Sequence, residues 1–470
     1  MVDLDRTLVL TDTLVEHFLI LVLRAPWRAI QCLLQLRKGK AAFKAAIART
    51  VELYDGAFLF NPELLAYLHA QKDSGRALHL VTASNQKMAD LVAARVGLFD
   101  SVTGTSSTVN LKGRNKLSYL EQAFPDGFCY AGDCAADLVI WAKSAGAVVV
   151  GADRATRDAM SRLPCPIELD LGRRTATARD WLQLLRLHQW SKNVLLFVPL
   201  LLGYKLAQLP TVFSVLVGFM AMGFVASGTY IVNDINDLIA DRAHATKRQR
   251  PIANGTIGAG QAIVVAAVLV AAGLGMMAWQ SLSAAGWLLL YLVGTLSYSC
   301  VFKRQPMVDV FILGGLYTLR LVIGVCLADE ALSHWLLMFS FFFFFSLSMA
   351  KRHVEIVKAA QKDSATVEIK GRGYRTTDIP LTLAFGVGTC LVAVLVLGLY
   401  VAFDINPQKL YRAPEWLWGI VVLVMVWSSR IWLLSHRGTL DDDPVAFAIR
   451  DRTSLCIGLV IVALFALSIA

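Results

Sequence analysis

The sequence has little charge. Only 17% of its 470 residues are Asp, Glu, Lys or Arg, against about 25% in soluble proteins. Residues 1–180 carry 22 bases and 19 acids, so 41 of 180 are charged; residues 181–470 carry 23 and 16, so 39 of 290 are charged. The first density suits a globular domain, and the second is too low for one. The net charge of +10, split as +3 and +7, therefore indicates cytoplasmic loops of a membrane protein rather than nucleic-acid binding.

Paired cysteine motifs are also absent. The eight cysteines form no CxxC pair and no spacing that would build a zinc site or a disulfide framework, so we expect reduced thiols. A cleaved signal peptide is not expected either. The apolar run from Leu14 to Leu23 is preceded by three aspartates instead of bases, and Glu16 and His17 lie inside it.

The first 170 residues alternate between strand-like and helical stretches. Strands are predicted over 77–81, 127–131 and 146–150, and helices over 88–96, 116–124 and 135–144. This alternation predicts a parallel α/β sheet. Residues 14–70 are mostly helical and read as an insertion after the first strand, and the polar stretches 161–166 and 172–179 read as a linker.

From Trp181 onward the chain consists of long apolar segments, and most reach the roughly 20 residues that a membrane-spanning helix needs. We count about nine: 194–209, 211–232, 261–280, 284–302, 308–327, 334–350, 379–402, 415–434 and 453–470, the first being short. The loops between them carry 16 bases on one side and 3 on the other. The positive-inside rule places the rich side, and with it the N-terminal region, in the cytoplasm.

Polar motifs stand where the predicted strands of the first region end. Asp3-Leu4-Asp5-Arg6-Thr7 follows the first possible strand, Thr82 ends the next, and Gly132–Asp137 (GDCAAD) follows a third; Lys116 opens a helix. Taken singly, DxDxT could be a surface turn and GDxxxD a helix cap. Together, at the edge where open α/β sheets bind ligands, they predict a catalytic site.

This set resembles the haloacid dehalogenase superfamily of phosphatases over about residues 1–170, with a Rossmann-type sheet and a small helical cap over about 14–60. The resemblance implies that Asp3 attacks phosphorus to give an aspartyl-phosphate, and that Asp5 protonates the leaving oxygen and then activates water. It also implies a Mg²⁺ ion held by Asp3, the Asp5 carbonyl and Asp133, with Asp137 in support.

Thr82 and Lys116 are the residues that this resemblance assigns to the transferring phosphoryl oxygens. Lys112 competes for the lysine role; we prefer Lys116 because it begins the helix that leads into the strand ending at Gly132. One feature departs from the family, since only Met1 and Val2 precede Asp3 where a full apolar strand is usual. A shortened strand would hold the nucleophile less firmly, so an inactive interaction module is an alternative.

A second acidic motif follows the second apolar segment. Asn233, Asp237 and Asp241 are spaced i, i+4 and i+8 and so share one helix face, with Asp234 beside them. Carboxylates grouped at a membrane surface repel each other unless a cation lies between them, and oxygen ligands suit Mg²⁺ bridging to phosphate. The bases that follow, which could hold phosphate oxygens, are His244, Lys247, Arg248 and Arg250. The alternative is a solvated loop of mixed charge.

The stretch NDINDLIADRAHATKRQRPIANG resembles the first aspartate-rich motif of the UbiA prenyltransferase superfamily, and within it the decaprenyl-phosphate phosphoribosyltransferase branch, NDxxDxxxDRxHxxKRxRPIA. The resemblance covers about 181–470 and implies that Asn233, Asp234, Asp237 and Asp241 hold the metal, Asp234 being the less certain. Further matches are the stretch 188–193 (HQWSKN), Tyr298 and Ser299 with Lys303, Asp309, Arg320, Lys351 and Arg352 with Glu355, and 443–447 (DPVAF) with Asp451.

The absence of a second aspartate-rich motif bears on which substrate donates the transferred group. Ordinary UbiA enzymes carry a second DxxxD motif for a prenyl diphosphate, whereas here Asp309 stands alone because residue 313 is Leu. The resemblance therefore implies phosphoribosyl pyrophosphate as donor and a polyprenyl phosphate as acceptor. The phosphate-binding candidates, each of which could instead be a positive-inside anchor, are Lys192, Lys247, Arg250, Lys303, Lys351 and Arg352. Arg320, inside an apolar segment, is expected to face a cavity, and His188 and His244 either contact ligand or are structural.

The two halves together predict a bifunctional enzyme: phosphoribose is transferred to polyprenyl phosphate, and the 5-phosphate is then removed. We expect domains at 1–172 and 194–470 joined by a basic linker with an interfacial helix over 173–193, in a bacterial-type inner (plasma) membrane with both sites cytoplasmic. The run Leu14–Leu23 with Trp27 is expected to lie against the membrane. The alternatives are a UbiA transferase of aromatic acceptors with an unrelated phosphatase, and a transporter with a regulatory domain. Lipid chain length and oligomeric state are not indicated.

Overall fold

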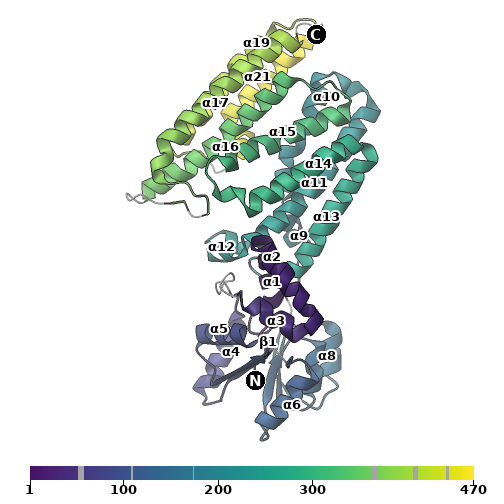
Figure 1. Ribbon diagram of the computed structural model, residues 1–470, viewed down its shortest axis with the longest axis vertical. Helices are drawn as coiled ribbons and strands as arrows, with labels where there is room; N and C mark the ends of the chain where they lie inside the picture. The colour runs from purple at the N-terminus through teal and green to yellow at the C-terminus, as the bar shows by residue number, and fades with distance from the viewer. Residues whose placement is uncertain are drawn as a thin grey trace. The chain divides into compact units, whose positions relative to one another are not determined.

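Figure 1 shows a computed structural model of the protein. The structure describes the whole chain except residues 51–57, 107–108, 173, 363–367, 370, 406–410, 441–443 and 470. The described residues form two compact units, Met1–Arg186 with Tyr230–Ala267 and Leu187–Thr229 with Val268–Ala470. Asp443 of the predicted motif matches lies outside the described residues, and the domain limits at 172 and 193 stay a prediction.

The first unit is built on a parallel sheet. Its strands are β1 (His79–Asn85), β2 (Ser101–Thr105), β3 (Cys129–Gly132), β4 (Gly146–Val150) and β5 (Ile167–Leu171). β1 pairs with β2, and β3–β4–β5 form a second parallel group. Val2 joins the two groups through parallel bridges to Leu80 and Ala131, so the predicted first strand is reduced to one paired residue. The predicted parallel α/β sheet is confirmed.

Helices cover this sheet and build the cap (Figure 1). Those packed around the sheet are α4 (Pro62–Asp73), α5 (Gln86–Val96), α6 (Arg114–Ala123), α7 (Leu138–Trp141) and α8 (Arg154–Met160). The cap consists of α1 (Thr13–Arg24), α2 (Pro26–Leu34), a 3₁₀ turn (Gln35–Lys38) and α3 (Lys40–Ala48). Asp12 caps α1, because its side chain accepts the Val15 N–H. Leu21, Ala29, Cys32 and Ile47 form the buried core of the cap.

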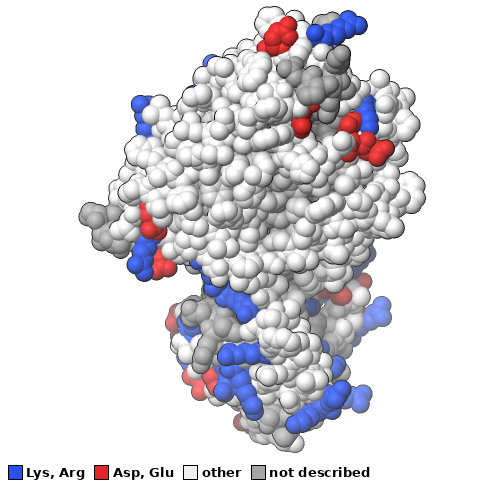
Figure 2. Space-filling model, turned by 45° about the horizontal axis from the view of Figure 1, so that its top comes forward, with Lys and Arg blue, Asp and Glu red and all other residues white. Residues whose placement is uncertain are grey.

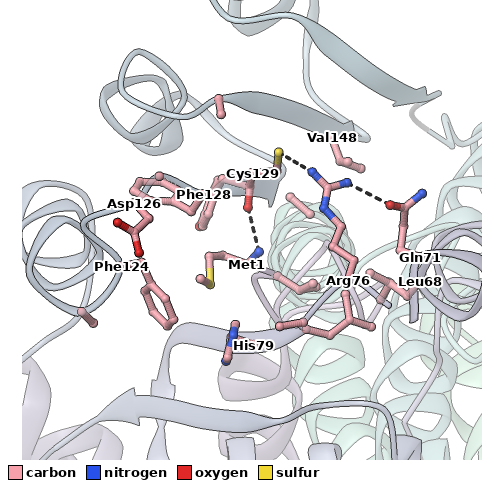
Figure 3. Close-up of a pocket in the computed structure, with 18 of the residues that line it drawn as sticks. Met1, Leu68, Gln71, Arg76, His79, Phe124, Asp126, Phe128, Cys129 and Val148 are labelled. Atoms are coloured by element: carbon pink, nitrogen blue, oxygen red, sulfur yellow. Dashed lines mark hydrogen bonds between the residues drawn. The ribbon is translucent and has the colours of Figure 1, made fainter. Parts of the chain in front are cut away.

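A pocket of about 530 Å³ opens between β1 and β3 beside Met1 (Figure 3). The Met1 ammonium group donates to the Cys129 carbonyl at 2.7 Å, and burial lowers its pKa to about 6. Arg76 lies across the pocket and donates to Gln71 and to the Cys129 sulfur. The pocket lies at the amino ends of the strands, whereas the predicted catalytic residues follow their carboxyl ends.

The second unit consists of helices. Within the described residues, eight helices are long and apolar enough to cross a membrane: α11 (Leu209–Asn236), α13 (Ala259–Gln280), α14 (Leu282–Cys300), α15 (Val308–Ala328), α16 (His334–Lys362), α17 (Ile379–Tyr400), α19 (Trp416–His436) and α21 (Arg452–Ile469). α11 and α13 continue into the first unit. Figure 2 shows few charged side chains over most of the surface of the helical part, as a lipid-facing surface requires.

The segment predicted as the first of nine spans is not one continuous helix. Residues 194–209 are divided among a 3₁₀ helix (Leu187–Phe197), α10 (Val198–Leu202) and a short turn (Lys205–Ala207). Pro199 lies in the first turn of α10, where its missing N–H is tolerated but interrupts a continuous helix, and Tyr204 has a left-handed backbone with φ of 56°. Leu196 and Leu200 are fully buried, so this apolar segment packs into the helical core as a broken stretch and not as one long helix.

Candidate active sites

The predicted phosphatase residues Asp3 and Lys116 lie side by side at the carboxyl edge of the sheet. Lys116 Nζ is 2.9 Å from Asp3 Oδ2, and its side chain is only 2% exposed. The same ammonium group donates to the Tyr130 hydroxyl at 2.7 Å, and that hydroxyl donates to Asp137 Oδ1 at 3.1 Å. Asp3, Lys116, Tyr130 and Asp137 thus form one buried chain of contacts, which favours Lys116 over Lys112 for the lysine role.

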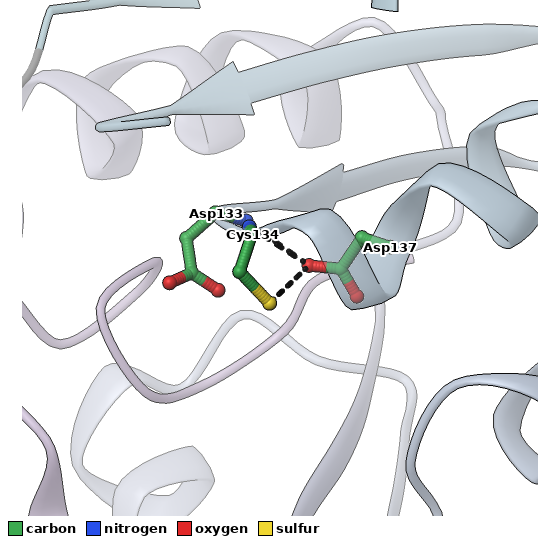
Figure 4. A group of neighbouring side chains, drawn as sticks. All are labelled: Asp133, Cys134 and Asp137. Atoms are coloured by element: carbon green, nitrogen blue, oxygen red, sulfur yellow. Dashed lines mark hydrogen bonds between the residues drawn. The ribbon is translucent and has the colours of Figure 1, made fainter. Parts of the chain in front are cut away.

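The loop after β3 gathers acidic side chains (Figure 4). Ligand atoms of Asp133, Cys134 and Asp137 lie within 4.8 Å of one another, the one such group among the described residues. Asp137 Oδ2 accepts the Asp133 and Cys134 N–H groups at 3.2 and 3.3 Å. A Cβ at Gly132 would come within 2.6 Å of Asp137 Oδ2, so a larger residue here would displace the Asp137 side chain.

The electrostatics of this loop fit a divalent cation. Burial, followed by the charges of Asp137 and Asp3, raises the pKa of Asp133 to about 7. Burial and the charge of Asp3 likewise raise the pKa of Asp137. The charge of Lys116 only partly offsets the effect of burial and of the neighbouring acids, and Mg²⁺, which prefers oxygen ligands, would supply further positive charge.

Asp5 is held in place by hydroxyl groups. Its Oδ1 accepts from the Thr13 N–H at 2.8 Å and the Thr13 hydroxyl at 2.6 Å, and Oδ2 accepts from the Ser84 hydroxyl at 2.5 Å. Burial, aided by the charge of Asp12, raises the pKa of Asp5 to about 6, which suits a general acid near neutral pH. Thr82 is fully buried within β1 rather than after it, and its hydroxyl accepts the Ser84 N–H at 3.0 Å.

Lys44 was not predicted from the sequence. It lies on the cap helix α3, and its Nζ donates to the Ala83 carbonyl at 2.6 Å and to Asn110 Oδ1 at 3.0 Å. Burial lowers its pKa, while the charge of Asp5 acts in the opposite direction. Among the described residues no carboxylate lies within ion-pair distance of Lys44, so the cap holds a lysine near the predicted catalytic acids that is not neutralised by a direct ion pair.

The aspartate-rich stretch lies at the end of α11 and in α12 (Leu238–Ala243). Asn233 donates to Asp237 Oδ2 at 3.1 Å, as the predicted i, i+4 spacing requires. Asp234 and Asp241, both buried, share Arg250, whose Nη1 is 3.1 Å from Asp234 Oδ1 and 2.5 Å from Asp241 Oδ2. Arg186, which was not predicted, also pairs with Asp234. Arg250 therefore bridges two of the predicted metal ligands.

The other predicted bases of this stretch lie in a surface turn. His244 is exposed, and its Nδ1 accepts the Thr246 and Lys247 N–H groups at 3.2 and 3.4 Å. This ring nitrogen therefore stabilises the turn locally. Lys247, also exposed, starts a short 3₁₀ helix (Lys247–Gln249).

Within the first unit, the cap is joined to the segment that follows α11. Arg242 forms two hydrogen bonds with Glu16 of α1, at 2.9 and 2.6 Å, and the two side chains are only 7% and 2% exposed. Arg24 at the end of α1 donates to the carbonyl of Asn236 at 2.9 Å. Glu16 and Arg24 thus link the cap to the aspartate-rich stretch.

In the second unit, three predicted substrate-binding residues meet. Asp309 of α15 is fully buried and accepts from Arg352 Nε at 2.6 Å and from the Tyr374 hydroxyl at 2.8 Å. Arg352 of α16 also binds Glu355 at 3.0 Å and donates to the Tyr298 hydroxyl at 2.9 Å. Because its guanidinium nitrogens are hydrogen-bonded to other side chains, Arg352 is the centre of a network that fixes the positions of Tyr298 and Asp309.

Arg320 lies in a separate cluster inside α15. It donates to Asn193 Oδ1 at 3.2 Å, the Leu316 carbonyl at 2.8 Å and the Tyr291 hydroxyl at 2.9 Å, and its guanidinium lies over the Tyr291 ring. Arg320 is only 5% exposed and is hydrogen-bonded within the protein, and the expectation that it faces a cavity stays a prediction. Of the remaining predicted bases, Lys303 is buried and Lys192 and Lys351 are half-buried.

Comparison with known proteins identifies both halves. The profile of the UbiA prenyltransferase family matches residues 196–465, more than half of the chain. The chain belongs to the UbiA prenyltransferase family. A second profile, that of haloacid dehalogenase-like hydrolases, matches residues 1–140. The UbiA chain is thus a multi-pass membrane protein with a haloacid dehalogenase-like domain at its N-terminus.

Individual relatives extend this result. The chain is 40% identical to the uncharacterized protein y4nM of Sinorhizobium fredii, over 99% of this chain and 90% of that protein. It is 34% identical to the decaprenyl-phosphate phosphoribosyltransferase of Corynebacterium glutamicum, over 38% of this chain and 55% of that protein. A solved UbiA homologue from Archaeoglobus fulgidus bound to DMAPP and Mg²⁺ has a TM-score of 0.47 and 15% identity, covering 62% of this chain and 97% of that one.

Proposed function

We propose that this UbiA protein transfers phosphoribose from phosphoribosyl pyrophosphate to a polyprenyl phosphate and then removes the 5-phosphate from the product. In the first step an oxygen of the lipid phosphate bonds to the anomeric carbon, and the bond from that carbon to pyrophosphate breaks. In the second step the ester bond between phosphorus and the 5-oxygen is cleaved by water. The final product is polyprenyl-phosphoryl-ribose.

The observation that best supports the proposed transfer reaction is the hydrogen bonding of Asp309. Both of its oxygens accept hydrogen bonds, from Arg352 and Tyr374, and residue 313 is Leu. This arrangement supports a donor other than a prenyl diphosphate, because the acid that would begin a second metal-binding motif is used within the protein. The likeness to decaprenyl-phosphate phosphoribosyltransferases supports the phosphoribosyl donor.

Asn233, Asp237 and Asp241 are the residues that we assign to Mg²⁺ in the transfer, with Asp234 beside them. When bound, the metal would neutralise the departing pyrophosphate. Arg250 already contacts both Asp234 and Asp241, so it is placed to exchange a carboxylate for a pyrophosphate oxygen. Lys192, Lys247, Lys303 and Lys351 remain the further candidates for phosphate contacts.

In the phosphatase step we assign the attack on phosphorus to the carboxylate of Asp3. Asp5, held by Thr13 and Ser84, gives its proton to the 5-oxygen of ribose as that oxygen leaves. It then takes a proton from the water that hydrolyses the aspartyl-phosphate. Lys116 and Thr82 are assigned to the transferring phosphoryl oxygens, and Asp133 and Asp137 to the metal.

We place both sites on the cytoplasmic side of a bacterial inner membrane. The sequence has 16 loop bases on the side that contains the aspartate-rich stretch and 3 on the other, and the positive-inside rule assigns the richer side to the cytoplasm. Phosphoribosyl pyrophosphate is a soluble anion, so a site facing the cytoplasm suits it. This orientation would be tested by introducing single cysteines into the loops and measuring which of them a membrane-impermeant thiol reagent modifies in intact cells.

The decisive experiment incubates the purified full chain with ³²P-labelled phosphoribosyl pyrophosphate, Mg²⁺ and polyprenyl phosphate, and separates the lipid products. With the label in the 5-phosphate, we expect a labelled lipid that loses its label to inorganic phosphate. A UbiA enzyme of aromatic acceptors with an unrelated phosphatase would give no labelled lipid. An inactive N-terminal domain would leave the label on the lipid.

Lys44 offers a test of substrate recognition. The proposed substrate carries a phosphodiester in addition to its 5-phosphate, and Lys44 is the cap residue placed to bind a second anion. We expect Lys44→Met to lower kcat/KM for the lipid-linked substrate by about ten- to a hundredfold and to change hydrolysis of ribose 5-phosphate little. Lys87→Met, at an exposed position on α5, is the matched control. Equal losses on both substrates would contradict this role.

The metal requirement of the phosphatase should depend on pH. Asp133 must be ionised to bind Mg²⁺, and its pKa is raised to about 7. Below that pH the metal must displace a proton, so its apparent affinity should fall about tenfold per pH unit, and above it the affinity should be constant. Mg²⁺ titrations of ribose 5-phosphate hydrolysis between pH 5.5 and about 8.5 would measure this. A flat profile would contradict the assignment of Asp133.

A further inference from the structure

The cap exposes an apolar stripe on α2. Ala29 and Cys32 of this helix are buried in the cap core, whereas Trp27, Ile30 and Leu34 are 78%, 48% and 51% exposed. These three residues are spaced i, i+3 and i+7 and therefore follow one face of the helix. Leu33 and Leu36 extend the exposed apolar surface. A contiguous apolar surface of this kind marks an interaction site.

The charge around this stripe has one sign. Between Glu16 and Glu52 the sequence contains seven bases and no acid. Arg28 lies on α2 itself, and Arg37, Lys38 and Lys40 follow directly; all four are exposed. An apolar stripe bordered by bases is typical of helices that lie in the interface of an anionic membrane.

The contacts of α1 place the cap beside the ends of two candidate spans. Arg24, two residues before α2, donates to the carbonyl of Asn236, the last residue of α11. A Cβ at Gly260, at the start of α13, would lie 3.3 Å from Val15. The buried pair of Glu16 and Arg242 holds the same helix between these two ends. All of these residues belong to the first unit.

We propose that α2 and the turn after it, Pro26–Lys38, are a membrane-binding element that inserts Trp27, Ile30 and Leu34 into the lipid interface. The expected apolar run Leu14–Leu23 does not serve this purpose, because Ile20 and Leu21 are fully buried. The element would hold the phosphatase cap at the bilayer surface, where a lipid-linked sugar phosphate is presented. This last consequence rests on the proposed function, whereas the membrane contact itself does not.

The contact is tested in the full chain reconstituted into nanodiscs of phosphatidylethanolamine and phosphatidylglycerol. A photoreactive p-benzoylphenylalanine is placed at Trp27 and, in a control variant, at Gln122, which is exposed on α6. We expect lipid adducts at position 27 in at least about fivefold higher yield than at 122, and fewer in nanodiscs of phosphatidylcholine alone. Absence of lipid adducts at position 27 would overturn the proposal. Crosslinks from position 27 to a second protein chain would overturn it as well and identify an interface between copies.

The consequence for catalysis is tested separately. We expect the double variant Trp27→Glu and Ile30→Glu to lower hydrolysis of the lipid-linked ribose 5-phosphate by about tenfold and to leave hydrolysis of free ribose 5-phosphate unchanged. Gln122→Glu adds charge at the exposed position on α6 and should change neither. If the wild type hydrolyses neither substrate, the proposed phosphatase function fails while the lipid crosslinks still decide the membrane contact. Equal hydrolysis of the lipid-linked substrate by both variants would overturn the role of the element in presenting substrate.

Discussion

Replacement of Asp3 by asparagine is expected to lower hydrolysis of the 5-phosphate by about ten thousandfold, so that lipid-linked ribose 5-phosphate accumulates. The amide has the shape of the carboxylate but is not a nucleophile, and it removes the negative partner of the buried Lys116, 2.9 Å away. Product analysis of the full chain would show the 5-phosphorylated lipid in place of the ribosyl lipid. Transfer of phosphoribose itself should continue.

The control for this variant is Asp73→Asn. Asp73 is an exposed acid at the end of α4, so its neutralisation removes the same charge without touching the site. Thermal unfolding of Asp3→Asn, compared with the wild type, would show that the sheet is intact. If Asp3→Asn gives the wild-type products, the N-terminal domain does not act as the phosphatase and the inactive-module alternative gains support.

A second large effect is expected for Asp237→Asn, which should lower lipid labelling by phosphoribosyl pyrophosphate by at least about a hundredfold. Asp237 lies where α11 gives way to α12 and accepts a hydrogen bond from Asn233 at 3.1 Å. An amide at this position would retain that contact poorly and would remove a charge from the proposed metal site. The loss should appear at saturating Mg²⁺ as well as at low Mg²⁺.

Asp329→Asn provides the comparison for that experiment. Asp329 is exposed at the end of α15 in a left-handed conformation with φ of 50°, which asparagine also tolerates. Phosphatase activity on ribose 5-phosphate should be the same in both variants and in the wild type. If the Asp237→Asn variant labels the lipid as fully as the wild type, the assignment of Asp237 to the metal site is contradicted.

The sequence was most informative where a pattern is local. The strand predicted over 146–150 matches β4, because all five residues are apolar and buried on both faces of the sheet. The first strand could be predicted only as incomplete, since Met1 and Val2 offer no periodicity. Its single paired residue, Val2, depends on Leu80 and Ala131, far along the chain.

Contacts between distant segments could not be predicted. The residues that were missed, Lys44, Tyr130 and Arg186, belong to no motif and reach the sites only through packing. Arg352 was predicted to bind phosphate because it is basic and adjacent to Lys351, yet its guanidinium is bound by Asp309, 43 residues away in the sequence. Hydrophobicity alone similarly predicted an unbroken apolar segment over 194–209, because it does not register the break near Pro199.

The ion pair between Glu16 and Arg242 has a consequence for biosynthesis. The ribosome adds Arg242 only 226 residues after Glu16, when the sequence of α11 has already been made. Until then the hydrogen bonds that join α1 to α12 cannot form. The cap therefore reaches its final packing only after the first apolar helix has been synthesised, so the N-terminal domain matures together with the membrane domain and not before it.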